Sequence, residues 1–273
     1  IWYLHSRKRR IIDMDDKQLT VLSSNFSWAT AAFMAKLSEN CYHSPEKFKD
    51  NIGTKSWTIR YFNFGGTQAY ALNGENNFIL AFRGTEPTKW QDIKADLDIK
   101  KVKSTSIDGK LEGKVHRGFK YALNDVWKDV VQHMKECEAD KKQVFITGHS
   151  LGAALATLVA GRLNNPDVVL YTYGSPRAGN RNWNSMQKFS HYRFRNNNDL
   201  VTRIPPAWLG FRHNGNFMYF NSNGDHKDKP GFFYMLGHWF KGIIKGIFTL
   251  SFDSFSDHNI NTYHKLCKQQ EIG

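Results

Sequence analysis

The sequence has few cysteines, no low-complexity segment and no membrane-length run of apolar residues without charges. Its three cysteines, Cys41, Cys137 and Cys267, stand far apart and form no Cys-x-x-Cys pair. This spacing argues against a disulfide framework and favours a reducing compartment, so we expect a cytoplasmic or membrane-associated protein, with secretion as the alternative. Zinc-finger spacing, aromatic RNA-binding motifs and a basic helix with heptads are also missing, which argues against a nucleic-acid partner.

The chain is rich in aromatic side chains and in positive charge. Its 273 residues are 40% hydrophobic and 14% aromatic, which is enough for a sizeable core. Lysine and arginine outnumber aspartate and glutamate by 38 to 25, giving a net charge of +13. This charge favours anionic partners such as acidic lipid surfaces, but it does not choose among them.

We predict one domain over residues 26–273, preceded by an N-terminal extension over residues 1–25. The extension opens with four apolar residues, followed closely by a basic run at residues 7–10. Two interpretations stay open: the end of a truncated membrane anchor with its cytoplasmic flank, or a charged terminus.

Hydrophobic periodicity predicts alternating strands and helices. Runs rich in β-branched and aromatic residues predict strands near 57–62, 68–72, 77–84, 143–148, 167–174 and 191–196. Apolar residues at helical spacing and an alanine-rich run predict helices over 26–42, 119–134, 151–163 and 180–189. This alternation implies an α/β fold, in which a mostly parallel sheet has helices packed on its faces.

The segment FITGHSLGAALA, residues 145–156, joins a predicted strand to a predicted helix through a Gly-x-Ser-x-Gly turn. Gly148 and Gly152 remove side chains that would collide in a tight turn, so Ser150 is presented at the start of the helix. There the backbone N–H of Leu151 can donate to a developing oxyanion. The pattern predicts a nucleophile elbow, although a purely structural glycine turn is an alternative that the motif alone leaves open.

A serine nucleophile needs a histidine to accept its proton and a carboxylate to orient that histidine. On this fold they follow the serine in the order acid, then histidine. Asp199 follows a predicted strand, where a loop residue overhangs the sheet edge, although a turn-forming role is the alternative. Five histidines come after it: His213, His226, His238, His258 and His264. We favour His258, since it lies late in the chain and opens a predicted helix.

Seven short stretches carry recognisable motifs, which follow one another along the chain. They are FRGTEPTKWQDIKADLDI, VHRGF, TGHSLGAALA, YGSPRAGN, NDLVTRIPP, FRHNGNFMYF and SDHNINTY, all within residues 57–266. Together they resemble the class 3 lipase family, the fungal-type triacylglycerol lipases and their bacterial and plant relatives. The resemblance implies an α/β-hydrolase fold with lid segments, with Ser150 as nucleophile, Asp199 as orienting acid and His258 as base.

The resemblance implies further roles. Thr85 would be the second oxyanion donor beside Leu151, although judged from the residues alone it is a threonine in a turn after a strand. A lid would contain Trp90. His149 would have a packing or hydrogen-bonding role away from the substrate, and Gly174 would shape a turn.

Residues 231–252 form a long apolar segment that departs from the compact fungal pattern. Lys241 and Lys245 near its middle argue against a membrane-spanning helix. As a helix, the segment has an apolar face opposite a basic one, which is typical of helices that lie in anionic headgroups. A helix packed on the core is the alternative. With the lid, Trp239 and Phe240 are the expected lipid contacts.

The sequence therefore predicts a serine carboxylic ester hydrolase acting on lipids, of the tri-, di- or monoacylglycerol lipase type. We expect an acyl-enzyme and no metal or organic cofactor. Phospholipase A1 activity is the alternative among enzymes, and an inactive lipid-binding or membrane-binding module is the alternative outside them. The expected partners are a lipid ester substrate and an anionic lipid surface contacted peripherally; the oligomeric state stays open.

Overall fold

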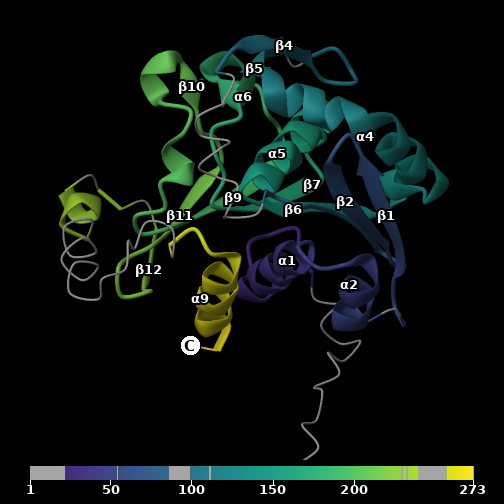
Figure 1. Ribbon diagram of the computed structural model, residues 1–273, viewed down its shortest axis with the longest axis horizontal. Helices are drawn as coiled ribbons and strands as arrows, with labels where there is room; N and C mark the ends of the chain where they lie inside the picture. Colours follow the sequence, from purple (N-terminus) through teal and green to yellow (C-terminus); the bar gives the residue numbers. More distant parts are fainter. Residues whose placement is uncertain are drawn as a thin grey trace, which may run out of the picture.

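A central β-sheet organises the protein (Figure 1). The computed structural model describes residues 22–53, 55–85, 99–110, 112–228, 230–231, 233–238 and 257–272. Strands from these ranges form a sheet in the order β1-β2-β3-β6-β7-β9-β11-β12. They are β1 (Thr58–Phe64), β2 (Thr67–Asn73), β3 (Asn77–Phe82), β6 (Gln143–His149), β7 (Val168–Tyr173), β9 (Ser190–Asn196), β11 (Asn216–Phe220) and β12 (His226–Asp228). The neighbours from β3 to β11 run parallel, whereas β1, β2 and β12 pair antiparallel at the edges, which confirms the mostly parallel sheet.

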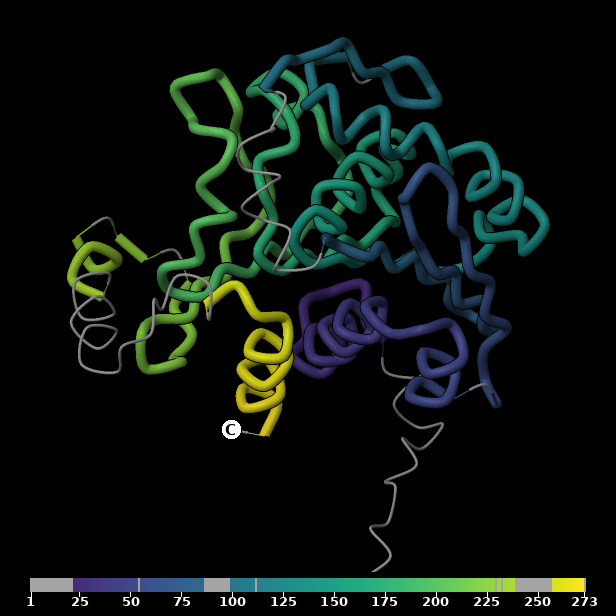
Figure 2. The backbone as a smooth tube through the Cα atoms, viewed as in Figure 1, coloured from purple at the N-terminus to yellow at the C-terminus, as the bar shows by residue number. Residues whose placement is uncertain are grey.

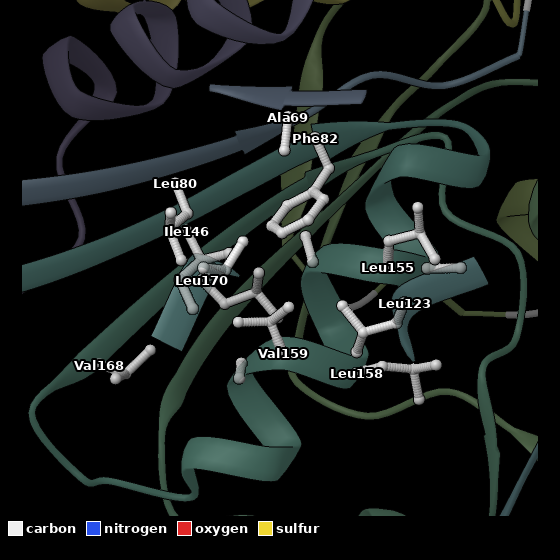
Figure 3. Close-up of a cluster of buried hydrophobic side chains, with 14 of the residues drawn as sticks. Ala69, Leu80, Phe82, Leu123, Ile146, Leu155, Leu158, Val159, Val168 and Leu170 are labelled. Atoms are coloured by element: carbon white, nitrogen blue, oxygen red, sulfur yellow. The ribbon is translucent and has the colours of Figure 1, made fainter. Parts of the chain in front are cut away.

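Helices cover both faces of this sheet (Figures 1 and 2). One face carries α1 (Trp28–Asn40), α2 (Pro45–Ile52) and α9 (Ile260–Ile272), and the other carries α4 (Arg117–Glu136), α5 (Leu151–Leu163) and α6 (Arg181–Ser185). Neighbouring residues of a strand point to opposite faces, so β6 sends Phe145 into the core beside α1 and Ile146 into the core beside α5. Figure 3 shows the core beside α5, where side chains of α5 meet those of the sheet.

A second, smaller sheet was not predicted from the sequence. Its strands β4 (Lys101–Thr105), β5 (Glu112–His116), β8 (Gly179–Asn180) and β10 (Phe211–Arg212) have the order β10-β8-β5-β4. Two of them have only two residues, and the other two have five residues with a single valine each as their apolar side chain, so none has a recognisable strand pattern. The described ranges also contain the short 3-10 helices η3 (Ala139–Lys141), η4 (Val201–Arg203) and η5 (Ala207–Leu209).

The helix expected over residues 180–189 is wrong in extent, because α6 has only five residues. The buried apolar residues of this window are Trp183 and Phe189. Residues six apart do not share a helix face, so both side chains reach the core only if the helix ends between them.

The structure describes all three cysteines, and each is a free thiol. Cys41 and Cys267 are buried, and Cys137 is half-buried. Burial raises the pKa of the Cys267 thiol well above its ordinary value. The two buried thiols therefore behave as small apolar side chains of the core.

Several predicted features lie outside the described residues. They include residues 1–21 of the extension, the lid around Trp90, and Trp239 and Phe240 of the apolar segment. From that segment, residues 233–238 are helical. No helix in the described ranges is long and apolar enough to cross a membrane. The division into an extension and a single domain stays a prediction.

Trp183 of α6 fills a slot made by three glycines. Its side chain is only 1% exposed. A Cβ atom on Gly161 of α5 would lie 2.2 Å from the Trp183 ring. A Cβ atom on Gly113 of β5 or on Gly179 of β8 would lie 2.4 Å from Trp183. The indole therefore joins the smaller sheet to α5, and the backbone around it has room for glycine alone.

We expect Trp183→Ala to lower the free energy of unfolding by about 3–5 kcal/mol, because it empties this slot. Urea denaturation measures the loss. Met186→Ala is the matched control, since Met186 directly follows the same helix and is 41% exposed; its effect should stay within about 0.5 kcal/mol. Equal losses in the two variants would contradict the assignment of Trp183 to the core.

Candidate active site

Ser150 lies between β6 and α5 in a backbone conformation that side chains rarely adopt. Its φ is 61° and its ψ is −130°, and the residue is 0% exposed. A Cβ atom on Gly148 would lie 2.5 Å from backbone atoms of Gly152, and one on Gly152 would lie 2.2 Å from the Phe82 carbonyl oxygen. The steric reason predicted for the two glycines is thus confirmed: the chain can make this turn only without side chains at both positions.

Ser150, His258 and Asp199 form a chain of hydrogen bonds. His258 Nε2 is 2.9 Å from Ser150 Oγ, and His258 Nδ1 is 2.9 Å from Asp199 Oδ2. Asp199 comes just after β9 and His258 just before α9, while Ser150 follows β6. Because the ionised Asp199 carboxylate only accepts hydrogen bonds, Nδ1 carries the proton and Nε2 accepts from the serine hydroxyl. Three residues far apart in the sequence thus meet at the carboxyl edge of the sheet.

The other four candidate histidines lie elsewhere. His213 Nε2 bonds the Thr202 carbonyl oxygen at 2.7 Å, and His264 Nδ1 lies 2.6 Å from a Glu39 carboxylate oxygen. His238 Nδ1 is 2.8 Å from Ser222 Oγ, and His226 lies edge-on against the Trp28 ring. Among the five, only His258 contacts both Ser150 and Asp199.

Tyr263 of α9 holds the Asp199 carboxylate. Its hydroxyl donates to Asp199 Oδ2 at 2.6 Å and accepts from the backbone N–H of Asn196 at 2.9 Å. Burial, together with the nearby Asp199 charge, raises the pKa of Tyr263 well above its ordinary value, so the phenol remains a donor. The second oxygen, Asp199 Oδ1, accepts from the backbone N–H of Val201 at 2.9 Å. Sequence reasoning missed Tyr263, although it lies five residues after His258 in the stretch SDHNINTY.

Asp257 ties the loop that carries His258 to the loop that carries Asp199. Its Oδ2 accepts from the backbone N–H of Asn198 at 3.0 Å and from Asn197 Nδ2 at 3.2 Å. Its carbonyl oxygen accepts from Asn196 Nδ2 at 3.1 Å. Hydrogen bonds therefore join the two loops directly before Asp199 and directly before His258 in the chain. Sequence reasoning also missed this residue.

His149, which precedes Ser150, supports the site from behind. Its Nε2 lies 2.7 Å from the His258 carbonyl oxygen and its Nδ1 lies 2.8 Å from the Tyr42 hydroxyl. Burial, helped by the neighbouring His258, lowers the pKa of His149 well below its ordinary value, so the ring is neutral. Nε2 then donates to the carbonyl and Nδ1 accepts from Tyr42. The hydrogen-bonding role expected for His149 is confirmed.

A cavity of about 300 Å³ adjoins the elbow. Its walls include Thr85 after β3 and Leu151 at the start of α5, the two residues predicted to supply oxyanion donors. Arg83 lines the same cavity and donates to Gln68 Oε1 at 2.6 Å. In the described ranges, no cluster of His, Cys, Asp or Glu side chains is arranged to hold a metal ion.

A parallel sheet flanked by helices, with a serine turn between a central strand and a helix, is the arrangement of an α/β-hydrolase. Residues 79–208 match the family model described as lipase (class 3). Secreted mono- and diacylglycerol lipase A of Penicillium cyclopium is 33% identical over 227 residues, covering 77% of this chain and 71% of that protein. The chain belongs to the class 3 lipase family, as its motifs predicted.

Further comparisons agree. Secreted mono- and diacylglycerol lipase 1 of Fusarium solani is 38% identical over 110 residues, which are 36% of this chain and 32% of that protein. The match thus spans about a third of that relative's length. The structure of the triacylglyceride lipase of Rhizomucor miehei is similar with a TM-score of 0.60 and 26% identity, covering 72% of this chain and 81% of that one. The predicted α/β-hydrolase fold is confirmed.

Gly174, which follows β7, gives His258 and Asp199 the room to meet. Its φ is +58°, and a Cβ atom there would lie 2.7 Å from Asp199 Oδ2 and 2.8 Å from His258 Nδ1. We expect Gly174→Ala to separate these two atoms. Proton NMR tests this, because the low-field resonance of the His258 Nδ1–H should disappear.

The matched control for this prediction is Gly109→Ala. Gly109 also has a positive φ, +71°, but a Cβ atom there would meet nothing within 4 Å. This variant should lose about 1 kcal/mol of stability from backbone strain and keep the low-field resonance. Persistence of the resonance in Gly174→Ala would contradict the steric argument.

Proposed function

We propose that the protein hydrolyses carboxylic esters of lipids through an acyl-enzyme on Ser150. The main support is the hydrogen-bond chain from Ser150 through His258 to Asp199, beside a cavity at the N-terminus of α5. A buried serine with a histidine nitrogen at its hydroxyl and a carboxylate behind the histidine is suited to nucleophilic attack.

The reaction follows from this geometry. As Ser150 Oγ attacks the ester carbonyl carbon, its proton passes to His258 Nε2, and Asp199 stabilises the resulting imidazolium. The backbone N–H groups of Thr85 and Leu151 would stabilise the negative charge on the carbonyl oxygen. His258 then gives its proton to the departing alcohol. A water molecule, deprotonated by His258, hydrolyses the acyl-enzyme, so the carboxylic acid leaves and Ser150 regains its proton.

The substrate class is proposed from the relatives. The names of the Penicillium and Fusarium proteins assign them mono- and diacylglycerols, and that of the Rhizomucor protein assigns it triacylglycerides. The cavity lining includes two leucines, Leu151 and Leu155, among polar residues and glycines. We therefore propose an acylglycerol as substrate. A phospholipid, cleaved by phospholipase A1 activity, is the second candidate, favoured by the net charge of +13.

Contact with lipid through Trp90, Trp239 and Phe240 is also a proposal. These residues lie outside the described ranges. Phe233, at the start of the helical stretch 233–238, is 83% exposed, which supports a lipid-facing role for this part of the chain.

Ser150→Ala should reduce hydrolysis of a soluble p-nitrophenyl ester by about 10³-fold or more, because the nucleophile is lost. Its melting temperature should stay near that of the wild type. Ser185→Ala is the control. Ser185 lies at the end of the short helix α6, and this variant should retain activity. Labelling by a fluorophosphonate probe should vanish in Ser150→Ala alone. An active, unlabelled wild type would rule out the serine mechanism, and no activity on any acylglycerol or phospholipid would favour the inactive module.

Tyr263→Phe should lower kcat by about ten-fold and leave KM unchanged, since a charge-assisted hydrogen bond to Asp199 is lost. Tyr263 does not line the cavity, so substrate binding should not change. Tyr173→Phe is the matched control, because it removes a buried hydroxyl that donates to the Ala31 carbonyl oxygen. Both variants should lose some stability, but only Tyr263→Phe should lose turnover. Equal kinetic effects would show that Tyr263 acts through general packing.

A further inference from the structure

The loop after Asp199 carries the most exposed large apolar side chain of the described residues. Trp208, in η5, is 85% exposed, and Leu200 of the same loop is 41% exposed. The loop lies beside β10 at the upper left of Figure 1. It follows β9 at the carboxyl edge of the parallel sheet, the edge that also presents Ser150. An indole this exposed contributes almost nothing to the core, so its position calls for another explanation.

Three cations hold this loop in place. The Arg177 guanidinium donates to the carbonyl oxygens of residues 203 and 205. The Arg212 guanidinium donates to those of residues 207 and 211, and the Lys101 ammonium donates to that of residue 209. The accepting carbonyl groups belong to residues that precede and follow Trp208 in the chain. Trp208 is thus exposed on a loop whose backbone these hydrogen bonds hold in place.

Carbonyl oxygens satisfy the N–H groups of these cations but do not neutralise their charge. Arg203 lies in the same loop and is exposed. Arg193 and Arg195 of β9 add two more cations, and the Arg195 charge, after burial, helps to lower the pKa of both Arg177 and Arg203. Across the described ranges, none of these five arginines, nor Lys101, forms an ion pair with a carboxylate. Positive charge is therefore concentrated at the loop that carries the exposed Trp208.

The buried end of the cluster shows the same excess of charge. Arg193 is 9% exposed and lies over the Phe217 ring at 4.6 Å, and Arg195 lies over the Tyr219 ring at 5.8 Å. Burial, with the neighbouring Arg195 and Arg177, lowers the pKa of Arg193 to about 9. Arg195 Nε is buried without a hydrogen-bond partner in the described structure. Such clustering of like charges is unfavourable unless an external anion compensates it.

We propose that Trp208, Leu200, Arg203 and Arg212, supported by Arg177 and Lys101, form a docking surface for an anionic lipid bilayer. The indole enters the headgroup region, where tryptophan is favoured, and the two exposed guanidiniums pair with lipid phosphates. This choice of partner rests on the proposed lipid esterase function. Because the loop begins next to Asp199, docking here brings the candidate active site to the surface in which such esters reside.

The test is flotation of Ser150→Ala protein with vesicles of phosphatidylglycerol and phosphatidylcholine, compared with phosphatidylcholine alone. The unmodified docking surface should bind the anionic vesicles, and raised salt should weaken binding. Trp208→Ala should weaken binding by about ten-fold, and Arg203→Gln by about five-fold. Both side chains are exposed and Arg203 makes no side-chain hydrogen bond in the described structure, so both variants should melt as the parent does. Arg203→Lys should restore binding.

The matched control is Tyr121→Ala with Lys128→Gln on α4, which also removes one exposed aromatic side chain and one positive charge. It should change binding by less than about two-fold. Equal weakening by the control would assign the binding to net charge and overturn the proposal. So would unchanged binding in Trp208→Ala with Arg203→Gln, or a preference of this surface for a single-stranded oligonucleotide over vesicles. Hydrolysis of a soluble ester by the wild type tests the proposed function separately.

Discussion

The close approach of the first turn of α5 to the ends of β3 and β6 is the constraint on which the site depends. It forces Ser150 to a φ of 61°, and it leaves no room for a Cβ atom at Gly148 or Gly152. The Ser150 backbone N–H donates to the Tyr173 carbonyl oxygen at 3.0 Å, which ties the strained residue to β7 as well. The buried sheet on either side over-determines this conformation, which is how such strain persists.

Around this turn, hydrogen bonds rather than apolar contacts set the remaining positions. Tyr263 and the Val201 N–H each bond one oxygen of the Asp199 carboxylate, and Asp257 joins the loops on either side. His149 bonds the backbone of His258. These groups are buried or, for Asp257, partly buried, where an unsatisfied donor or acceptor is costly, so each bond also specifies where its partner must lie. The polar network and the strained turn are therefore parts of one arrangement.

Positive charge is distributed unevenly over this fold. The net charge of +13 made an anionic partner reasonable from the sequence but gave no location. The structure gathers arginines from β9, β10 and the loops after β7 and β9 near the loop that carries the exposed Trp208, although these residues are up to 35 positions apart in the chain (Arg177 to Arg212). Their carbonyl partners fix the loop without cancelling its charge. The excess of positive charge in the composition is thus concentrated on the surface around the loop that carries Trp208.

The sequence by itself determined what depends on neighbouring residues. The alternation of strands and helices, the glycine-flanked serine turn and the class 3 lipase family all follow from local patterns such as residues 145–156. The order of Ser150, Asp199 and His258 was also present in the chain, but five histidines satisfied it. Local periodicity has no information about contacts across more than a hundred residues.

Only the tertiary structure decided which groups meet. The parallel order of β6, β7 and β9 brings Ser150 and Asp199 to one edge, where His258, just before α9, lies between them and Tyr263 of α9 bonds Asp199. Two of the four strands in the smaller sheet have only two residues, and their pairing with distant segments alone defines them as strands. The exposure of Trp208 could not be predicted from the sequence either, because tryptophan is usually largely buried. These features depend on contacts between distant segments, and such contacts exist only once the chain has folded.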